Sequence, residues 1–136
     1  YFGLSDWFEL NVAGKYRNVT CIPADNKTNS YDLISKSEIV LVYNSTIGIE
    51  AVSRGRKTLT AAKSHYSNVG FIKNLKNTEN YLLEIDRILK QKDFSVNKEQ
   101  IQLANEYLHT LKNNVSYNLD NFVQSDKKQK ISVKNI

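Results

Sequence analysis

The sequence has little of what builds disulfide-linked or metal-linked frameworks. Its 136 residues include one cysteine, Cys21, two histidines and no methionine. A single cysteine excludes a disulfide within the chain, and with two distant histidines it argues against a zinc site. No metal or other cofactor is therefore predicted. Cys21 lies in the apolar segment NVTCI, which favours a buried thiol with a structural role.

Long apolar runs are also absent. No segment reaches the roughly 20 apolar residues that a membrane-spanning helix requires, and no signal peptide is recognisable. We therefore expect a cytoplasmic protein. Residues 126–136 are rich in lysine and are predicted to form a flexible tail. A peripheral contact with an anionic inner-membrane surface is the alternative for that tail.

The charge of the chain is moderately positive. It carries 19 basic and 14 acidic residues, which gives a formal net charge of +5. This balance favours anionic partners such as nucleotides and phosphates. No nucleic-acid partner is predicted, because no basic cluster is interleaved with aromatic residues as a strand-binding groove requires.

Hydrophobic periodicity predicts an alternation of helices and strands. Helices are expected at residues 4–10, 30–37, 46–54, 77–91 and 97–115, the last with a continuation to Phe122, and strands at residues 18–23, 38–43 and 57–62. The run at 38–43 is continuously apolar and largely β-branched, which is typical of a parallel strand buried on both faces. The order indicates an α/β fold with a Rossmann-like parallel sheet, helices on both faces and two C-terminal helices.

The predicted elements form one domain over residues 1–125, followed by the tail at 126–136. The chain opens on YFGLSDWFEL without an initiator methionine. We therefore expect it to be a fragment of a larger protein.

The stretch VYNSTIGIEAV joins an apolar strand to an amphipathic helix. Ligands of open parallel sheets bind beyond the carboxyl ends of the strands, where Asn44, Ser45 and Thr46 lie. With Ser45 as N-cap, the free N–H groups of residues 46–48 point outward and form an anion site with the helix dipole. Gly48 allows a ligand or a neighbouring strand to approach closely.

Glu50 follows Thr46 by four residues, so the two share one face of the predicted helix. A carboxylate there could accept both hydroxyls of a ribose, as acidic residues do in dinucleotide-binding folds. The alternative is structural. Serine and threonine are ordinary helix caps, and Glu50 with Arg54 makes an ordinary i,i+4 surface pair. Spacing alone leaves both interpretations open.

A second candidate pair, His65 and Tyr66, follows the strand predicted at 57–62. The pair lies in a loop expected on the same side of the sheet as Ser45, and such loops often carry functional residues. The alternative is an exposed loop histidine beside a packed tyrosine.

The segment SYDLISKSEIVLVYNSTIGIEAVSRGRKTLTAAKSHYSNVGF resembles the donor-binding half of GT-B glycosyltransferases, and most closely that of bacterial capsule and surface polysaccharide biosynthesis proteins. The matching elements, in order, are Tyr31, Leu33, Ser37-Glu38, Ser45-Thr46, Gly48, Glu50-Ala51, Gly55, Tyr66 and Gly70-Phe71. They cover about residues 30–72. Glu38 replaces the usual aspartate of the family, and Lys57 stands where the family often has proline.

The resemblance implies a site for a nucleotide-sugar donor. Ser45 and Thr46 would contact the donor phosphates, and Glu50 the hydroxyls of the ribose or sugar. The loop with His65 and Tyr66 would border the donor, with His65 on phosphate or sugar. The glycan or lipid-linked acceptor and the catalytic base would belong to an N-terminal domain outside this sequence, so the isolated chain is expected to be inactive.

Two further interpretations keep the same architecture. The site would also suit a sugar-nucleotide epimerase or a polyol-phosphate transferase of the teichoic-acid type. A different class of function is a non-catalytic α/β module that binds a ligand or a partner protein.

Overall fold

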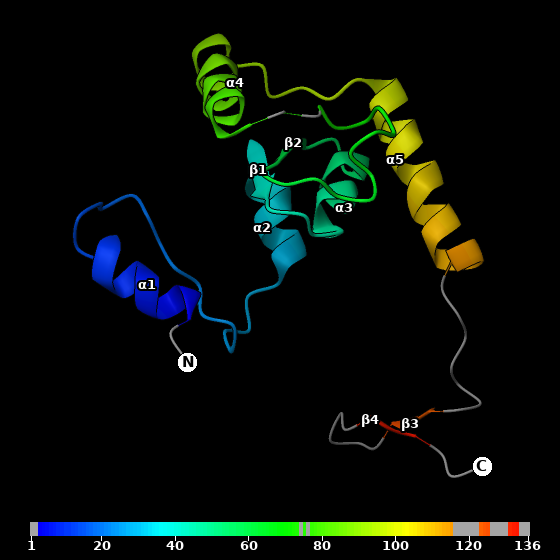
Figure 1. Cartoon of the computed structure of the whole chain (residues 1–136), viewed down its shortest axis with the longest axis horizontal. Helices are drawn as coiled ribbons and strands as arrows, with labels where there is room; N and C mark the ends of the chain where they lie inside the picture. Colours follow the sequence, from blue (N-terminus) through cyan, green and yellow to red (C-terminus); the bar gives the residue numbers. More distant parts are fainter. Residues whose placement is uncertain (1–2, 74, 76, 116–122, 126–130, 134–136) are drawn as a thin grey trace. The chain divides into compact units, whose positions relative to one another are not determined.

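The computed structural model describes residues 3–73, 75, 77–115, 123–125 and 131–133 (Figure 1). The chain forms two compact units, Tyr1–Lys36 and Ser37–Ile136. Within the described residues, no helix combines the length and apolar character needed to cross a membrane.

The first unit consists of two short helices and the irregular segment between them. Helix α1 spans Leu4–Asn11 and helix α2 spans Ser30–Lys36. Both agree with the predicted helices. The side chain of Asn29 accepts a hydrogen bond from the Tyr31 N–H at 2.8 Å, so an asparagine turn leads into α2.

The strand predicted at residues 18–23 is wrong, because these residues form no regular secondary structure. Val19 and Ile22 are exposed, and Cys21 is half-buried rather than buried. An extended segment becomes a strand only when a neighbour completes its backbone hydrogen bonds and covers one of its faces. No described strand pairs with this segment.

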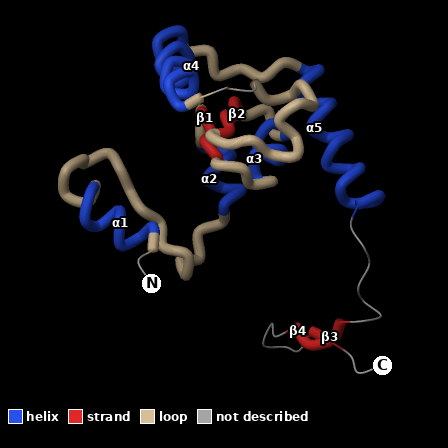
Figure 2. Tube along the Cα trace, viewed as in Figure 1, coloured by secondary structure: helices blue, strands red, loops and turns tan. Residues whose placement is uncertain are grey.

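The second unit is built on two parallel strands. Strand β1 (Ile39–Val42) and strand β2 (Lys57–Thr60) are joined by helix α3 (Ile47–Ser53). The register places Ile39 opposite Lys57 and Val42 opposite Thr60. The prediction of an α/β fold with parallel pairing is confirmed at this level. The described parallel sheet has two strands (Figure 2), which is fewer than predicted.

Strand β1 is less buried than its apolar sequence predicts. Its residues are half-buried or exposed, and Leu41 is 51% exposed. The prediction of burial on both faces is wrong, because a two-stranded sheet has too few neighbours to cover every face of each strand. Strand β2 is the better buried of the two, with Thr58, Leu59 and Thr60 all buried.

Helix α4 spans Thr78–Gln91 and helix α5 spans Lys98–Thr110. Helix α5 begins with the capping box formed by Asn97 and Gln100, two residues that the sequence marks as a capping pair. The chain continues from α5 into a π-helical turn, Leu111–Val115. The predicted continuation to Phe122 lies outside the described residues.

The hydrophobic core of the second unit lies between α3, α5 and the loop that follows β2. Its buried members are Ile49, Val52, Tyr66, Phe71, Ile72 and Ala104. Figure 1 shows α5 beside α3. Gly55 ends the turn after α3 with a φ of +74°, a conformation that glycine adopts without strain.

Near the C-terminus, strand β3 (Val123–Ser125) pairs antiparallel with strand β4 (Ile131–Val133). The rest of the tail predicted at 126–136 lies outside the described residues.

Candidate functional site

The carboxyl ends of β1 and β2 lie side by side and carry the predicted motif. The Ala61 and Ala62 N–H groups donate to the carbonyl oxygens of Val42 and Tyr43 at 2.8 and 2.9 Å. Parallel pairing therefore continues past the strands themselves. Asn44–Thr46 follow directly and are exposed, so their polar side chains are accessible where a parallel sheet normally binds its ligand.

The start of α3 differs from the prediction in its N-cap and in the number of free N–H groups. The N-cap is Thr46 rather than Ser45, and its backbone is helical, with φ −59° and ψ −21°. The Ile47 N–H donates to the Ser45 hydroxyl at 3.4 Å, and the Gly48 N–H donates to the Ser45 carbonyl at 3.1 Å. Because the chain turns before the helix begins, two of the three predicted free N–H groups already have partners.

Tyr66 holds the motif from inside the protein. Its side chain is fully buried, and its hydroxyl donates to the Ser45 carbonyl at 2.6 Å. Burial raises the pKa of Tyr66, which keeps the phenol protonated as a donor. Tyr66 therefore holds the Ser45 backbone from the protein interior. This agrees with the alternative interpretation of the His65–Tyr66 pair, in which the tyrosine is packed in the core.

Gly48 is buried in close contact with the same tyrosine. A Cβ atom added at Gly48 would lie 3.0 Å from the Tyr66 hydroxyl and 3.0 Å from Val42 Cγ2. Of the two reasons considered for this glycine, the structure supports the close approach of a neighbouring strand. Glycine lets α3 pack directly on β1.

Glu50 lies in the first turn of α3 and is half-buried. The predicted surface pair with Arg54 is not formed, since no ion pair between described residues involves Glu50. The backbone N–H of Glu50 is 3.5 Å from the Thr46 carbonyl. The two residues are therefore one helical turn apart, as the spacing predicts.

His65 is exposed and packs against helix α5. Its Nδ1 lies 2.8 Å from the Tyr107 hydroxyl, and the two rings stack with centroids 5.8 Å apart. The Tyr107 hydroxyl also donates to the His65 carbonyl at 3.2 Å. Sequence reasoning missed Tyr107, because it lies 42 residues further along the chain and no local pattern connects the two.

An open pocket of about 450 Å³ lies beyond the carboxyl end of β2. It is lined by Thr60, Ala61, Ala62, Lys63, Asn68, Leu75, Asn77, Thr78 and Tyr81. The Lys63 side chain brings a positive charge, and Asn77 and Thr78 form the N-terminal end of α4. The pocket lining includes none of the predicted site residues at 44–50 and 65–66. Its link to the motif is the pair of backbone hydrogen bonds from Ala61 and Ala62 to Val42 and Tyr43, which precede Asn44.

Thr60 is the most buried polar residue that lines this pocket. Thr60 is 5% exposed, and no hydrogen bond of its side chain occurs within the described part of the chain. Burial also raises the pKa of Tyr81 on the opposite side of the pocket. The predicted site included neither Thr60 nor Tyr81. The two residues are 21 positions apart in the sequence, and only the folding of the loop after Phe71 brings them to one pocket.

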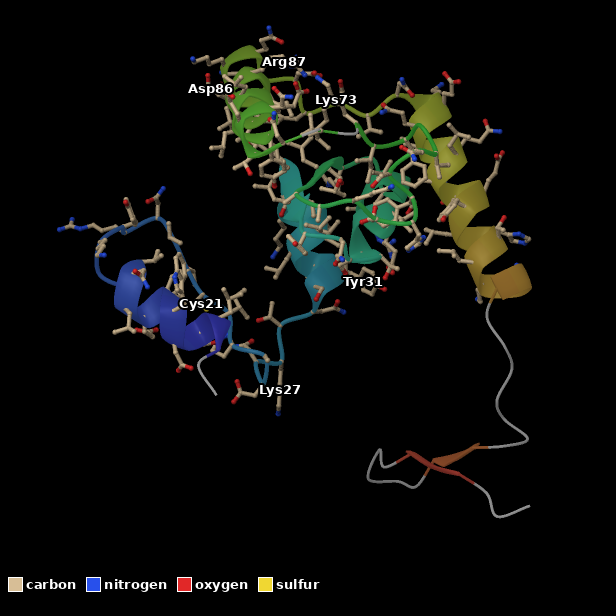
Figure 3. The ribbon with its side chains drawn as sticks, in the orientation of Figure 1. Cys21, Lys27, Tyr31, Lys73, Asp86 and Arg87 are labelled. Atoms are coloured by element: carbon tan, nitrogen blue, oxygen red, sulfur yellow. The ribbon has the colours of Figure 1, made fainter. Side chains whose placement is uncertain are left out.

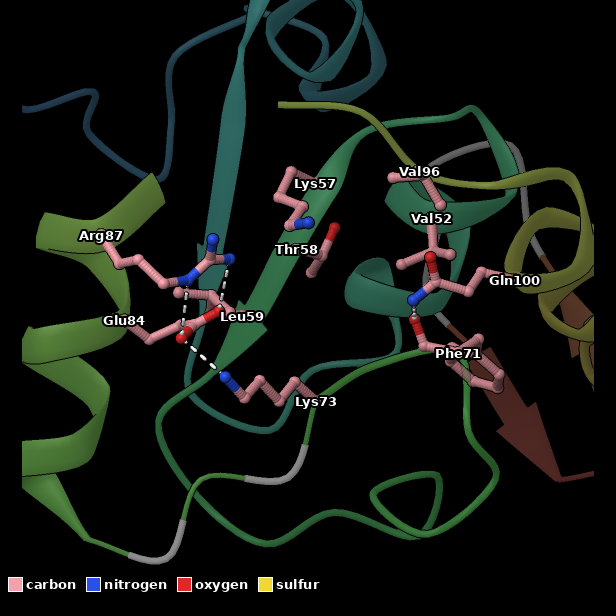
Figure 4. Close-up of a pocket in the computed structure, with 10 residues that line it drawn as sticks. All are labelled: Val52, Lys57, Thr58, Leu59, Phe71, Lys73, Glu84, Arg87, Val96 and Gln100. Carbon is pink, nitrogen blue, oxygen red and sulfur yellow. Dashed lines mark hydrogen bonds and ion pairs between the residues drawn. The ribbon is translucent and has the colours of Figure 1, made fainter. Parts of the chain in front are cut away.

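A smaller pocket, of about 210 Å³, lies beside the other end of β2 (Figure 4). Its charged residues pair with one another. The Glu84 carboxylate accepts hydrogen bonds from Lys73 at 2.7 Å and from Arg87 at 2.9 and 3.2 Å. Asp93 bridges Arg87 at 3.0 Å and Lys57 at 3.3 Å. We call these five residues the ion-pair cluster.

The pairing in this cluster shifts the titration of its acids. The hydrogen bonds from Arg87 and Lys73 lower the pKa of Glu84 from 4.5 to about 2. The hydrogen bonds from Arg87 and Lys57 lower the pKa of Asp93. Figure 3 labels Arg87 on α4 and Lys73 in the loop before that helix, and Figure 4 shows both side chains reaching the Glu84 carboxylate. The cluster therefore ties α4 to β2 and to the loop before α4.

The described residues contain no group of three or more His, Cys, Asp or Glu side chains that could hold a metal ion. Together, the fold and the larger pocket define a small mixed α/β protein with a polar, open pocket at the carboxyl ends of paired parallel strands. Comparison with protein-family models, with curated proteins and with solved structures finds no match.

Proposed function

We propose that the second unit binds the nucleotide-sugar donor of a glycosyltransferase that builds a bacterial surface polysaccharide, either capsule or lipopolysaccharide. The observation that carries the proposal is the open pocket of about 450 Å³ beyond the carboxyl end of β2, whose partner strand β1 leads into the exposed residues 44–46. It lies where ligands of parallel α/β sheets bind. The resemblance of residues 30–72 to GT-B donor-binding domains supports the same conclusion.

The polar groups at the carboxyl ends of the two parallel strands suit a phosphorylated ligand. The hydroxyls of Ser45 and Thr46 are exposed hydrogen-bond donors for phosphate oxygens. Lys63 supplies a positive charge against the negative charge that develops on the leaving phosphate during transfer. Glu50, which has no ion pair with another described residue, is assigned to the hydroxyls of the ribose or sugar.

The acceptor and the catalytic base are assigned to a domain outside this sequence. An epimerase or a polyol-phosphate transferase of the same architecture would use the same donor pocket. A non-catalytic binding module would also keep the pocket. It would be distinguished by a lack of catalytic activity when the chain is joined to its partner domain.

Nucleotide titration followed by amide chemical shifts tests the proposal. We expect CMP, CDP, UDP or GDP to shift residues 44–46, 60–63 and 77–81. The amides of Val96 and Gln100, which line the smaller pocket, serve as an internal control and should not move. If none of the four nucleotides shifts residues 44–63 at millimolar concentration, the donor-site proposal is contradicted.

A substitution of Glu50 separates binding from folding. Glu50→Ala should weaken nucleotide-sugar binding while leaving the amide spectrum of α5 unchanged, because Glu50 lies at the start of α3 and pairs with no described residue. Global loss of the folded spectrum would instead assign Glu50 a structural role. The same variant in the parent enzyme should reduce transfer more than it reduces stability.

A further inference from the structure

We propose that Tyr107 is a positioning residue that selects, in the neutral imidazole of His65, the tautomer with its proton on Nδ1. In this form Nε2 is presented to solvent as a hydrogen-bond acceptor. The proposal rests on the two hydrogen bonds between the residues, and it gives the exposed histidine of the loop after β2 a defined chemical role.

The contact between the two residues is extensive. The ring planes differ by 22° with centroids 5.8 Å apart, while Nδ1 lies 2.8 Å from the Tyr107 hydroxyl. Tyr107 is half-buried and also packs against Phe71, with ring centroids 5.8 Å apart. His65 meets Tyr66 edge to face at 5.0 Å. The imidazole is therefore held by aromatic rings as well as by hydrogen bonds.

Counting protons fixes the tautomer. A tyrosine hydroxyl has one proton to donate, and its oxygen can also accept. The His65 carbonyl can only accept, so the Tyr107 proton is used in that bond at 3.2 Å. For both bonds to form together, Nδ1 of His65 must donate in the bond at 2.8 Å. Of the two neutral tautomers, only the one with its proton on Nδ1 allows both bonds.

The tautomer of His65 determines which group of a ligand its side chain can contact. In the neutral ring the lone pair lies on Nε2, which has no partner among the described residues. Such a nitrogen accepts a hydrogen bond from a hydroxyl and does not bond to a phosphate oxygen, which is also an acceptor. If the proposed function holds, His65 contacts a hydroxyl of the sugar rather than a phosphate of the donor.

The tautomer is measurable, because the chain has only two histidines, His65 and His109. We would record imidazole ¹⁵N spectra of protein labelled at histidine at about pH 9, well above the ordinary histidine pKa of about 6.5. His65 should show a protonated Nδ1 and an unprotonated Nε2. His109 is exposed on α5, has no hydrogen bond between described residues to fix its tautomer, and serves as the control.

The variant Tyr107→Phe removes the hydroxyl and keeps the ring that packs against Phe71. The Nδ1 and Nε2 signals of His65 should then move to the pattern of His109, while the amide spectrum of residues 98–110 is preserved. A wild-type His65 with its proton on Nε2 would overturn the proposal before any substitution is made. An unchanged His65 pattern in a folded Tyr107→Phe protein would overturn the role of Tyr107.

Inorganic sulfate tests the acceptor role directly. Sulfate has no proton at this pH and can only accept hydrogen bonds, so it should leave the His65 Nε2 signal unmoved. A sulfate-dependent shift at His65 but not at His109 would indicate anion binding and overturn the assignment of a hydroxyl. These outcomes do not depend on nucleotide binding, so a failed nucleotide titration would contradict the proposed function and not the tautomer.

Discussion

The two ends of β2 border pockets that differ in how their charges are satisfied. Beside Lys57, at the start of the strand, the ion-pair cluster surrounds a space of about 210 Å³. Beyond Thr60, at the end of the strand, Lys63 lines a space of about 450 Å³. No ion pair between described residues involves Lys63.

This difference separates a structural site from one suited to a ligand. In the ion-pair cluster, each acid is bonded to two basic side chains, so a ligand would have to break existing contacts before it gained new ones. At the other end of β2, the side chains of Lys63 and Thr60 line an open pocket. A ligand there could bind to the charge and the hydroxyl without first breaking an ion pair.

The largest expected effect comes from neutralising the acid at the centre of the ion-pair cluster. The Glu84 side chain is 8% exposed, and Glu84→Gln leaves Lys73 and Arg87 without their shared charge partner. We expect a loss of about 2 kcal/mol in the free energy of unfolding, measured by urea denaturation. Partial exposure of both cations keeps the loss below that of a fully buried pair.

A matched control lies on the same helix. Asp86 pairs with Lys90 at 2.6 Å on the exposed side of α4, and Asp86→Asn should cost no more than about 0.5 kcal/mol. Equal losses for the two variants would remove the distinction between the ion-pair cluster and an ordinary surface pair.

The pH dependence of stability is a second test of the contribution of Glu84. Because the pKa of Glu84 falls from 4.5 to about 2 on folding, its contribution is complete above about pH 4.5. It is then lost as the pH falls toward 2, because the unfolded chain binds the proton first. Denaturation measured across this range should show a smaller acid-induced loss in Glu84→Gln than in the wild type. Parallel curves would contradict the assignment.

A smaller effect is expected behind the larger pocket. Tyr66→Phe removes the hydrogen bond to the Ser45 carbonyl and keeps the buried ring, so we expect a loss of about 1 kcal/mol in unfolding free energy. The amides of residues 44–46 should shift, because the bond at 2.6 Å holds the turn in place. An unchanged spectrum there would show that the turn is held by its local hydrogen bonds alone.

The smallest effect on stability is expected at the open pocket itself. Lys63 is exposed, and Lys63→Gln should change the unfolding free energy by less than about 0.5 kcal/mol. Nucleotide affinity should fall about fivefold, or about 1 kcal/mol, with loss of one charge-assisted contact. The control is Lys98→Gln, an exposed lysine on α5. Equal affinities in both variants would exclude Lys63 from the site.

The sequence predicted those elements whose signals are local. The capping pair Asn97 and Gln100 marks the start of α5, and the glycine at 55 marks the turn after α3, because both act within a few residues. The strand predicted at 18–23 failed because strand formation needs a partner, and an apolar pattern contains no information on whether one is present.

The candidate site was predicted only in part, because some of its features depend on local sequence and others on contacts between distant residues. The exposed polar residues at 44–46 follow from the end of an apolar strand, and the structure places them where expected. The role of Ser45 as N-cap did not follow, since a single extra turn changes which N–H groups are free. Thr60 and Tyr81 were missed, because the loop between them decides that they line one pocket.

By itself, the sequence determined where α4, α5 and the two parallel strands form, because periodicity and caps operate over three or four residues. Only the tertiary structure decided that Tyr66 supports Ser45 across 21 residues and that Tyr107 holds His65 across 42. Contacts at such separations depend on the path of the whole chain, and each ordered loop between them costs conformational entropy that core packing must offset. The same path decided which end of β2 has its charges paired and which end is open to a ligand.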